Sequence, residues 1–319
     1  MKKKHLALLL SAVLAVGLVL TGCSGDSASP KGKVNVFNWG VYIDDSVLED
    51  FTAQTGILVN YDIYDSNEAM YGIIKNDGAS YDVVIPSDYM ISRMIEEDML
   101  APLNFDHIPN FSDVDPILKN PEYDPENLYS VPYMWGLLGI IYNTNMVEGE
   151  VDSWSVMFDE AHDGQILMYD NSRDTIGIAL KYLGYSYNTT DEAQIKEAVD
   201  LLIRQKPLVQ AYVMDTIFDL LQGEVAAIGS YYYGDYLTMA EVNPDLAFAL
   251  PKEGTNYFVD AMCIPKGAAN KEAAEMYINF MCETAVAVDN CLVIGYSTPQ
   301  LEAEAALPPD IRDNPWMYP

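Results

Sequence analysis

Short apolar runs alternate with segments of helical period through the first third of the chain. The apolar runs are predicted to be strands at 34–37, 57–61 and 81–86. A helix is expected after each strand, because apolar residues then recur every three or four positions. The first of these helices is predicted to begin in a capping box at 46–49 and to end before Gly56. Repeated strand–helix units at this spacing predict an α/β fold built on a parallel sheet.

The second half of the chain repeats this alternation after an interruption. Four prolines and the absence of any period indicate an irregular loop over 105–128. The apolar run at 129–142 fits a strand that crosses between two lobes. Further strands are predicted at 166–169, 225–228 and 259–264, and further helices at 175–183, 192–205 and 271–282. A second α/β region is therefore expected to follow the crossing strand.

The size and charge of the chain limit the functions that it can have. With 319 residues and a mass of 35.5 kDa, it is longer than one compact core usually organises, which favours two domains or lobes. There are 48 acidic residues against 17 basic ones, and the formal net charge is −31. Such a chain is repelled by nucleic acids and by anionic membrane surfaces, so we expect neither as a partner. Cationic ligands are attracted to it.

The first residues have the pattern of an export signal. Three lysines and a histidine precede an apolar run at 6–20, which is short for a membrane span. The run ends in Leu20-Thr21-Gly22-Cys23, which resembles a bacterial lipobox; the alternative is an ordinary secretory signal with a chance cysteine. We expect a signal peptide at 1–22, acyl chains on Cys23 and a flexible lipidated tether at 23–33. The lipid anchor alone would then hold the protein on the extracytoplasmic face of the cell membrane.

The remaining cysteines and the motif content give no support to an enzyme. Cys263, Cys282 and Cys291 are too few and too widely spaced for a disulfide framework or a zinc site. Buried free thiols are expected, and a bond between the last two would require their backbones to meet. The chain has no Gly-x-Ser-x-Gly, P-loop or Gly-x-Gly-x-x-Gly sequence. We predict no catalytic residue, no metal ligand and no cofactor.

Aromatic rings accompany carboxylates at the ends of the predicted strands. The chain holds 23 tyrosines and 4 tryptophans. Aromatic residues occur at 38–42, 86–89, 169–174, 230–235, 257–260 and 295–299, and the middle four of these segments also hold Asp. In open α/β sheets, ligands bind beyond the carboxyl ends of the strands. Ring faces attract ammonium groups, and carboxylates accept their hydrogen bonds, so the pattern favours an elongated organic cation. Taken singly, each ring is as readily explained as a core residue.

A series of short motifs runs in order over most of the chain, from 34 to 299. They are Asn38-Trp39, Ser66-Asn67-Glu68, Tyr81-Asp82, Pro132-Tyr133-Met134-Trp135-Gly136, Gly184-Tyr185, Asn188-Thr189-Thr190, Gly223-Glu224-Val225, Pro251-Lys252-Glu253-Gly254 and Ile294-Gly295-Tyr296. Together they resemble the spermidine/putrescine-binding proteins of polyamine ABC transporters. The resemblance implies a two-lobed periplasmic-binding-protein fold, with 34–135 and 261–300 in one lobe and 136–260 and 301–319 in the other. It implies a monomeric, non-enzymatic receptor that closes on a polyamine and delivers it to the permease subunits of an importer.

The resemblance also implies which residues bind the ligand. Position by position they are Trp39, Tyr42, Ser87, Tyr89, Asn171, Asp174, Tyr231, Phe258, Asp260 and Tyr296. Asp260 is the central carboxylate and Asp174 a second one, whereas Asn171 stands where spermidine binders of the family often have Asp. Two matched carboxylates suit a diamine, so putrescine is expected to bind at least as well as spermidine unless Asp170 turns inward.

Two other functions remain open at this point. The adjacent tyrosines at 231–233 are similar to those of ferric-binding proteins, although none of the three histidines falls in the candidate loops. A glycosidase would need two carboxylates as acid and base, and Asp174 and Asp260 would be the pair. Tyrosinate–iron colour and cleavage of chromogenic glycosides are the observations that separate these functions from a polyamine receptor.

Overall fold

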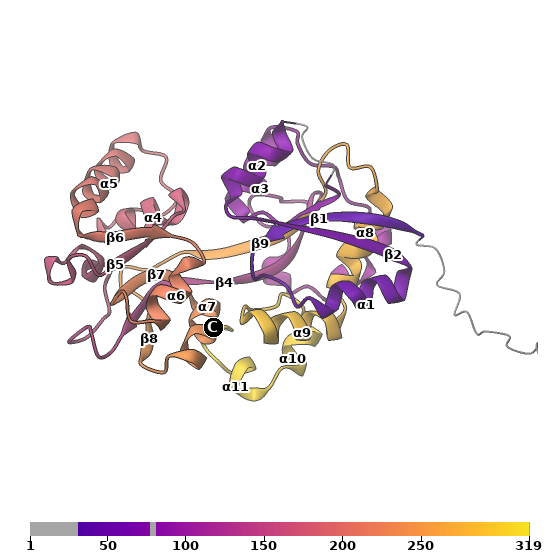
Figure 1. Ribbon diagram of the computed structural model, residues 1–319. Coiled ribbons are helices and arrows are strands. Elements are labelled where there is room, and N and C mark those ends of the chain that lie inside the picture. The colour runs from indigo at the N-terminus through magenta and orange to yellow at the C-terminus, as the bar shows by residue number, and fades with distance from the viewer. Residues whose placement is uncertain (1–30, 77–80, 319) are drawn as a thin grey trace, which may run out of the picture.

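Two lobes joined by two long strands make up the molecule (Figure 1). The computed structural model describes residues 31–76 and 81–318. β4 (Ser130–Asn143) and β9 (Tyr257–Cys263) lie antiparallel and pass from one lobe into the other. Both strands are almost fully buried, which agrees with their near-continuous apolar sequence. They carry the main connection between the lobes.

The first lobe places three parallel strands beside β9. These are β1 (Gly32–Trp39), β2 (Ile57–Tyr64) and β3 (Val83–Val84), in the order β2-β1-β3-β9. The helices are α1 (Ser46–Thr55), α2 (Asn67–Lys75), α3 (Asp88–Glu96), α8 (Lys271–Met281) and α9 (Thr284–Ile294). One face of the sheet packs on Phe51 and Tyr277, and the other on Met70 and Met90. Helices therefore cover both faces, and the carboxyl ends of the strands point toward the second lobe.

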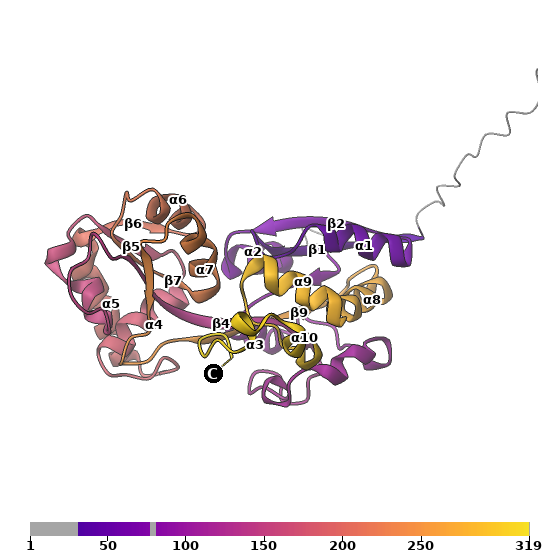
Figure 2. The ribbon, with the colours of Figure 1, turned by 90° about the horizontal axis from the view of Figure 1, so that it is seen from below.

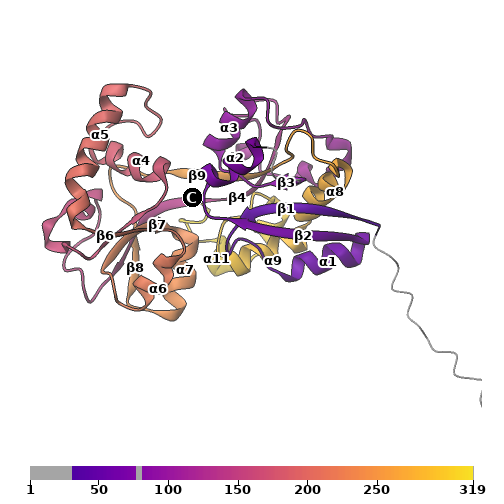
Figure 3. The same cartoon turned by 45° about the horizontal axis from the view of Figure 1, so that its top comes forward.

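The second lobe repeats this layering around the far halves of the crossing strands. Its strands are β5 (Ile166–Tyr169), β6 (Val209–Val213), β7 (Ile228–Tyr232) and β8 (Leu246–Ala249). The order is β4-β7-β5-β6, with β8 on the other side of β4. Its helices are α4 (Ser172–Tyr182), α5 (Glu192–Gln205), α6 (Thr216–Gln222) and α7 (Tyr233–Val242). Figure 3 shows α4 and α5 on one side of this sheet and α6 and α7 on the other.

A third connection between the lobes follows α9. It contains α10 (Leu301–Ala306) and α11 (Pro309–Arg312), which lie below the crossing strands in Figure 1 and in front of them when seen from below (Figure 2). Ser297 exchanges two backbone hydrogen bonds with Trp135 of β4, at 3.1 and 3.2 Å. Leu307 belongs to an apolar cluster with Cys291 of α9, and Tyr233 of α7 packs against this cluster. This segment therefore contacts both lobes.

The structure confirms the α/β class and corrects several local predictions, among them the strand at 225–228, because β7 begins only at Ile228. The sheet is mixed rather than parallel, because the crossing strands and β8 are antiparallel to their partners. The capping box at 46–49 is wrong: Asp45 precedes α1 without capping it, and the Ser46 N–H donates to Asp44 Oδ1 at 2.9 Å. The end of α1 is as predicted, with Gly56 in the left-handed region at φ 77°. The predicted loop at 105–128 contains three short 3₁₀ turns, at Phe105–His107, Pro109–Asp113 and Pro116–Leu118.

Some predictions concern residues beyond the described ranges. The signal peptide at 1–22, Cys23 and the tether up to residue 30 lie outside them. The three cysteines of the described part are free and buried, as predicted. Among the described residues, no single helix is long and apolar enough to span a membrane, although the bent pair of α8 and α9 together meets that test of length and composition.

Candidate functional site

A cavity of about 470 Å³ opens between the lobes, at the carboxyl ends of the parallel strands. From the first lobe it is lined by the ends of β1 and β2, the turn before α3, and β9. From the second lobe it is lined by β5, the turn between β6 and α6, and the junction of β7 with α7. The lining residues are Trp39, Gly40, Val41, Tyr42, Tyr64, Asp65, Ser87, Tyr169, Asp170, Tyr212, Val213, Met214, Asp215, Thr216, Phe218, Tyr231, Tyr232, Asp235, Phe258, Asp260 and Tyr296. The position and shape are those of a cleft that takes up a small molecule.

Asp260 of β9 is the most deeply buried carboxylate in this lining. Its side chain is 5% exposed, and the Tyr42 hydroxyl donates to Oδ2 at 2.8 Å. Oδ1 is buried and receives no hydrogen bond of normal geometry, although the Ser87 side chain lies near the carboxylate and, like Tyr42, opposes the rise of its pKa. Burial raises the pKa of Asp260 to about 7. A buried carboxylate with one unsatisfied oxygen is stabilised by a cation that donates a hydrogen bond to it.

Aromatic rings that are themselves held in place form the walls around Asp260. The Trp39 Nε1–H and the Tyr64 hydroxyl both donate to the Ile85 carbonyl, at 2.9 and 2.7 Å. The rings of Trp39 and Tyr64 are 4.7 Å apart, and that of Phe258 lies 4.7 Å from Tyr232. Because their polar atoms are already bonded, these rings present faces and edges rather than donors to the cavity. Such a wall suits methylene groups and ammonium charge.

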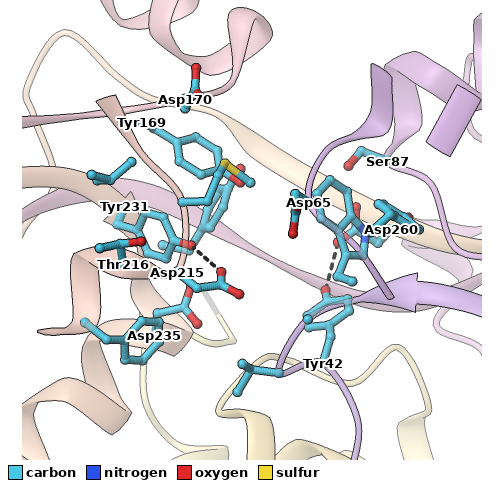
Figure 4. Close-up of a pocket in the computed structure, with 18 of the residues that line it drawn as sticks. Tyr42, Asp65, Ser87, Tyr169, Asp170, Asp215, Thr216, Tyr231, Asp235 and Asp260 are labelled. Atoms are coloured by element: carbon cyan, nitrogen blue, oxygen red, sulfur yellow. Dashed lines mark hydrogen bonds between the residues drawn. The ribbon is translucent and has the colours of Figure 1, made fainter. Parts of the chain in front are cut away.

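Two further carboxylates enter the cavity from the second lobe. Tyr231 donates to Asp215 Oδ1 at 3.1 Å, and Tyr296 donates to Asp235 Oδ2 at 2.5 Å. Burial raises the pKa of Asp235 to about 7 and also raises that of Asp215, with a smaller contribution from the charge of Asp65. Figure 4 shows both carboxylates on the side of the cavity opposite Asp260. The cavity thus has acidic groups at both ends.

Seven of the ten residues implied by the resemblance line the cavity. They are Trp39, Tyr42, Ser87, Tyr231, Phe258, Asp260 and Tyr296. Tyr89 does not line it, and its hydroxyl donates to Glu68 Oε1 at 3.1 Å. Asn171 is the N-cap of α4, where its side chain accepts from the Asp174 N–H at 3.1 Å. An Asn in this position satisfies a backbone donor at the helix start.

Asp174 lies behind the cavity wall, with its carboxylate already surrounded by donors. Tyr187 and Asn256 donate to Oδ1 at 2.7 and 2.9 Å, and Tyr232 donates to Oδ2 at 2.6 Å. The residue is 3% exposed and does not line the cavity. Tyr232 therefore stands between this carboxylate and the space that a ligand would occupy.

Several lining residues were not among the predicted ligands. The acidic ones are Asp65, Asp170, Asp215 and Asp235. Asp170 and Asp235 lie within two of the segments that combine rings and carboxylates, at 169–174 and 230–235. The sequence pattern could therefore have identified both as candidate ligand contacts. Asp65 and Asp215 follow β2 and β6 closely, and β6 was not among the predicted strands. Within the described lining, five aspartates face a cavity to which no lysine, arginine or histidine contributes.

The structure does not bring together the residues that ferric-iron binding or glycoside hydrolysis would need. The hydroxyls of Tyr231, Tyr232 and Tyr233 engage Asp215, Asp174 and Asn314 respectively, so they do not converge on one iron-sized point. In the described part of the chain, no group of three His, Cys, Asp or Glu side chains is placed to hold a metal ion. The glycosidase pair fails on access, since Asp174 is separated from the cavity that Asp260 lines.

Comparison with known proteins identifies the family. Residues 46–318 match the family model described as bacterial extracellular solute-binding protein. The chain is 36% identical, over 96% of its length and 89% of the relative's, to the spermidine/putrescine-binding periplasmic protein of Escherichia coli K12. A crystal structure of the substrate-binding protein of a spermidine/putrescine ABC transporter from Streptococcus pneumoniae is similar at TM-score 0.77 and 39% identity, covering 90% of this chain and 89% of that one.

A second solved structure supports the same conclusion. It is a lipoprotein of Treponema pallidum, similar at TM-score 0.81 and 28% identity, and the match covers 86% of this chain and 88% of that one. The two-lobed fold and the resemblance inferred from the short motifs are therefore confirmed. With most of its length matched by the family model and by relatives above 30% identity, the chain belongs to the bacterial extracellular solute-binding proteins.

Proposed function

We propose that the protein is the polyamine receptor of an ABC importer and that its two lobes close on the ligand. The observation that carries the proposal is Asp260, a carboxylate that is only 5% exposed and that lines a cavity walled by aromatic rings. The E. coli and S. pneumoniae relatives are named for spermidine and putrescine, which fits this chemistry. No step of catalysis is required of these residues.

A diamine that spans the cavity would give hydrogen-bond partners to the buried carboxylates at its two ends. One ammonium would bind Asp260 and the other Asp235, while the methylenes between them pack on Trp39 and Phe258. Each buried carboxylate then gains a charged hydrogen bond, which offsets the cost of removing it from water. Both lobes contribute to the contact, so binding favours the closed arrangement about β4 and β9. Of the residues that the resemblance implies, we retain Ser87, Tyr42, Tyr231 and Tyr296 as further parts of the wall.

Calorimetric titration of the purified protein tests this function. Putrescine and spermidine should bind with a 1:1 stoichiometry, and ligand at 100 times its Kd should stabilise the fold by about 2.7 kcal/mol in thermal unfolding. Ferric citrate, a neutral disaccharide and 4-aminobutyrate, which replaces one ammonium by a carboxylate, serve as controls. Absence of heat and of stabilisation with every polyamine would refute the proposal, and cleavage of a chromogenic glycoside would point to an enzyme.

We also propose that Cys23 anchors the protein outside the cytoplasmic membrane, after removal of residues 1–22. The support is the sequence Leu20-Thr21-Gly22-Cys23 and the description of the T. pallidum relative as a lipoprotein. Wild type labelled with a fatty acid should partition with membranes, and Cys23→Ala should lose the label and appear in the soluble fraction. Membrane association of Cys23→Ala without label would show that the lipobox assignment is incorrect. The monomeric state and the delivery to permease subunits belong to the same proposal.

A further inference from the structure

Two tyrosines connect the carboxylates at the two ends of the cavity. The Tyr42 hydroxyl donates to Asp260 Oδ2 at 2.8 Å (Figure 4), and the Tyr296 hydroxyl donates to Asp235 Oδ2 at 2.5 Å. The two rings pack edge to face, with their centroids 5.2 Å apart. Both tyrosines are buried in the core of the first lobe, whereas Asp235 belongs to α7 of the second. The spacing of the two carboxylates therefore depends on how closely α7 approaches Tyr296.

Gly234, the residue before Asp235, makes that approach close. A Cβ built at position 234 would lie 2.5 Å from Cδ2 of the Tyr296 ring and 2.9 Å from the carbonyl oxygen of Gly295, at the end of α9. A Cβ built on Gly295 would in turn lie 2.8 Å from the Gly234 carbonyl oxygen. The two lobes thus approach each other here backbone to backbone, and a side chain at position 234 would separate them.

The conformation of the backbone does not explain why residue 234 is glycine. Gly295 is the C-cap of α9 and has a φ of 74°, in the left-handed region that favours glycine. Gly234 lies in the first turn of α7 and does not have a positive φ. Alanine is more stable than glycine in a helix, so the sequence gives up some helix stability at this position. The close contact with the first lobe accounts for that choice.

The Tyr296 ring has no room to move aside for a side chain at position 234. The residue is 6% exposed, and the ring of Phe258 lies 5.8 Å away. On the opposite edge of the ring, Cδ1 would lie 3.3 Å from a Cβ built on Gly136 of β4. The ring thus fills a slot between two glycines, one on a crossing strand and one in the second lobe. A methyl group at position 234 is therefore accommodated by a displacement of α7, and Asp235 moves with that helix.

We propose that Gly234 is a positioning residue that sets the length of diamine that the cleft accepts. By letting α7 lie against Tyr296, it fixes the span between Asp235 and Asp260. A diamine with an ammonium group at each carboxylate must then have the matching number of methylenes between its nitrogens. The inference rests on the proposed polyamine function and adds to it what determines the length of the ligand.

Calorimetry with diamines of increasing length tests this role. The ligands are 1,3-diaminopropane, putrescine and cadaverine, each one methylene longer than the one before. Gly234→Ala should lower the affinity for putrescine by roughly tenfold, because a charged hydrogen bond is stretched, and should raise the ratio of cadaverine to putrescine affinity by about fivefold. A general loss of stability would lower the affinity for every diamine by the same factor. The ratio therefore reports on positioning rather than on folding.

Gly72→Ala is the matched control, because Gly72 lies within α2 and no other described segment comes within 4 Å of a Cβ built there. It should leave each affinity within about twofold of the wild type. Gly136→Ala is a second variant that decides the question if Gly234→Ala does not fold. Its Cβ would meet ring atoms of Phe258 and Tyr296 at 3.1–3.3 Å rather than backbone. Because it pushes the Tyr296 ring toward α7, it should raise the same ratio by a smaller factor.

The outcomes separate this inference from the proposed function. Equal losses for all three diamines in the folded variants, or no loss, would overturn the role of Gly234 while leaving polyamine binding in place. If the wild type binds no polyamine, the proposed function fails and the inference fails with it.

Discussion

The two faces of the cleft are built differently. On the first-lobe face, Asp260 sits on a buried crossing strand, and the rings beside it donate to the backbone carbonyl of Ile85. On the second-lobe face, Asp215 precedes a seven-residue helix and Asp235 lies in the first turn of α7. One face is fixed by the core of its lobe, and the other is carried by segments near the surface. The fixed face suits what all polyamines share, an ammonium next to methylenes, and the other face suits what distinguishes them.

The largest expected effect is the loss of the Asp260 charge. Asp260→Asn keeps the volume of the side chain but leaves an ammonium without its buried carboxylate, which typically costs about 3–5 kcal/mol. Binding of putrescine and of spermidine should both weaken by roughly two to three orders of magnitude, with the far-UV spectrum unchanged. Calorimetry measures the loss. A decrease of less than tenfold would mean that the first-lobe face does not dominate recognition.

The pH dependence of binding should be the next largest effect. Burial raises the pKa of both Asp260 and Asp235 to about 7 in the ligand-free cleft, so each is increasingly protonated below that pH. Since an ammonium prefers the ionised carboxylates, affinity should rise from pH 5.5 to 7.5, by at most about tenfold per pH unit for each proton released, and then level off. Over pH 4–7 the same groups should make the ligand-free protein less stable as pH rises, because ionisation is disfavoured in the fold and not in the unfolded chain.

Titrations in the single variants show which face is responsible. Asp260→Asn and Asp235→Asn should each flatten the pH profile of affinity, and calorimetry in buffers of different ionisation enthalpy should record fewer released protons. If the affinity of the wild type does not change between pH 5.5 and pH 7.5, the assignment of both groups as ligand contacts is contradicted.

Removing one ring face should have an intermediate effect. Phe258→Leu preserves apolar volume against Tyr232 but removes the ring that an ammonium can approach, an interaction of about 0.5–2 kcal/mol. The affinity for putrescine should fall roughly two- to thirtyfold. Affinity for a diamine that equals the wild type would show that the ring serves packing alone. Phe258→Tyr is the control, since it keeps the ring.

The smallest effect is expected at Asn171. Asn171→Asp retains a helix-capping side chain and adds a charge outside the lining of the cavity, so the ratio of spermidine to putrescine affinity should change less than threefold. Competition binding measures the ratio. A clear shift toward spermidine would favour the count of charges made from the sequence over the positions seen in the structure.

The sequence predicted those parts of the fold that have a marked period or a long apolar run. The crossing strand at 129–142 and the helix at 192–205 agree closely with β4 and α5. Helices α7 and α9 were not predicted, because apolar residues are spread around them rather than gathered on one face. The direction of the crossing strands was also out of reach, since pairing across 120 residues has no local signature.

At the site, the sequence indicated that carboxylates and aromatic rings would be present, but not which of them a ligand could reach. Asp260 and Asp174 each stand near rings in the chain, yet only Asp260 lines the cavity. The difference arises from Tyr187 and Asn256, which lie 13 and 82 residues from Asp174 in the chain but donate hydrogen bonds to its carboxylate after folding. Whether a carboxylate is free to bind depends on such donors, and these are assembled only by tertiary packing.

The segment after α9, which pairs with β4 through Ser297 and contacts the second lobe through the apolar cluster of Leu307, bears on how the lobes can move. A hinge made of two neighbouring strands can both bend and twist. We expect an additional segment that contacts both lobes to resist twisting and so to favour opening of the lobes about one axis. We therefore expect the loaded receptor to offer its permease one reproducible pair of lobe surfaces.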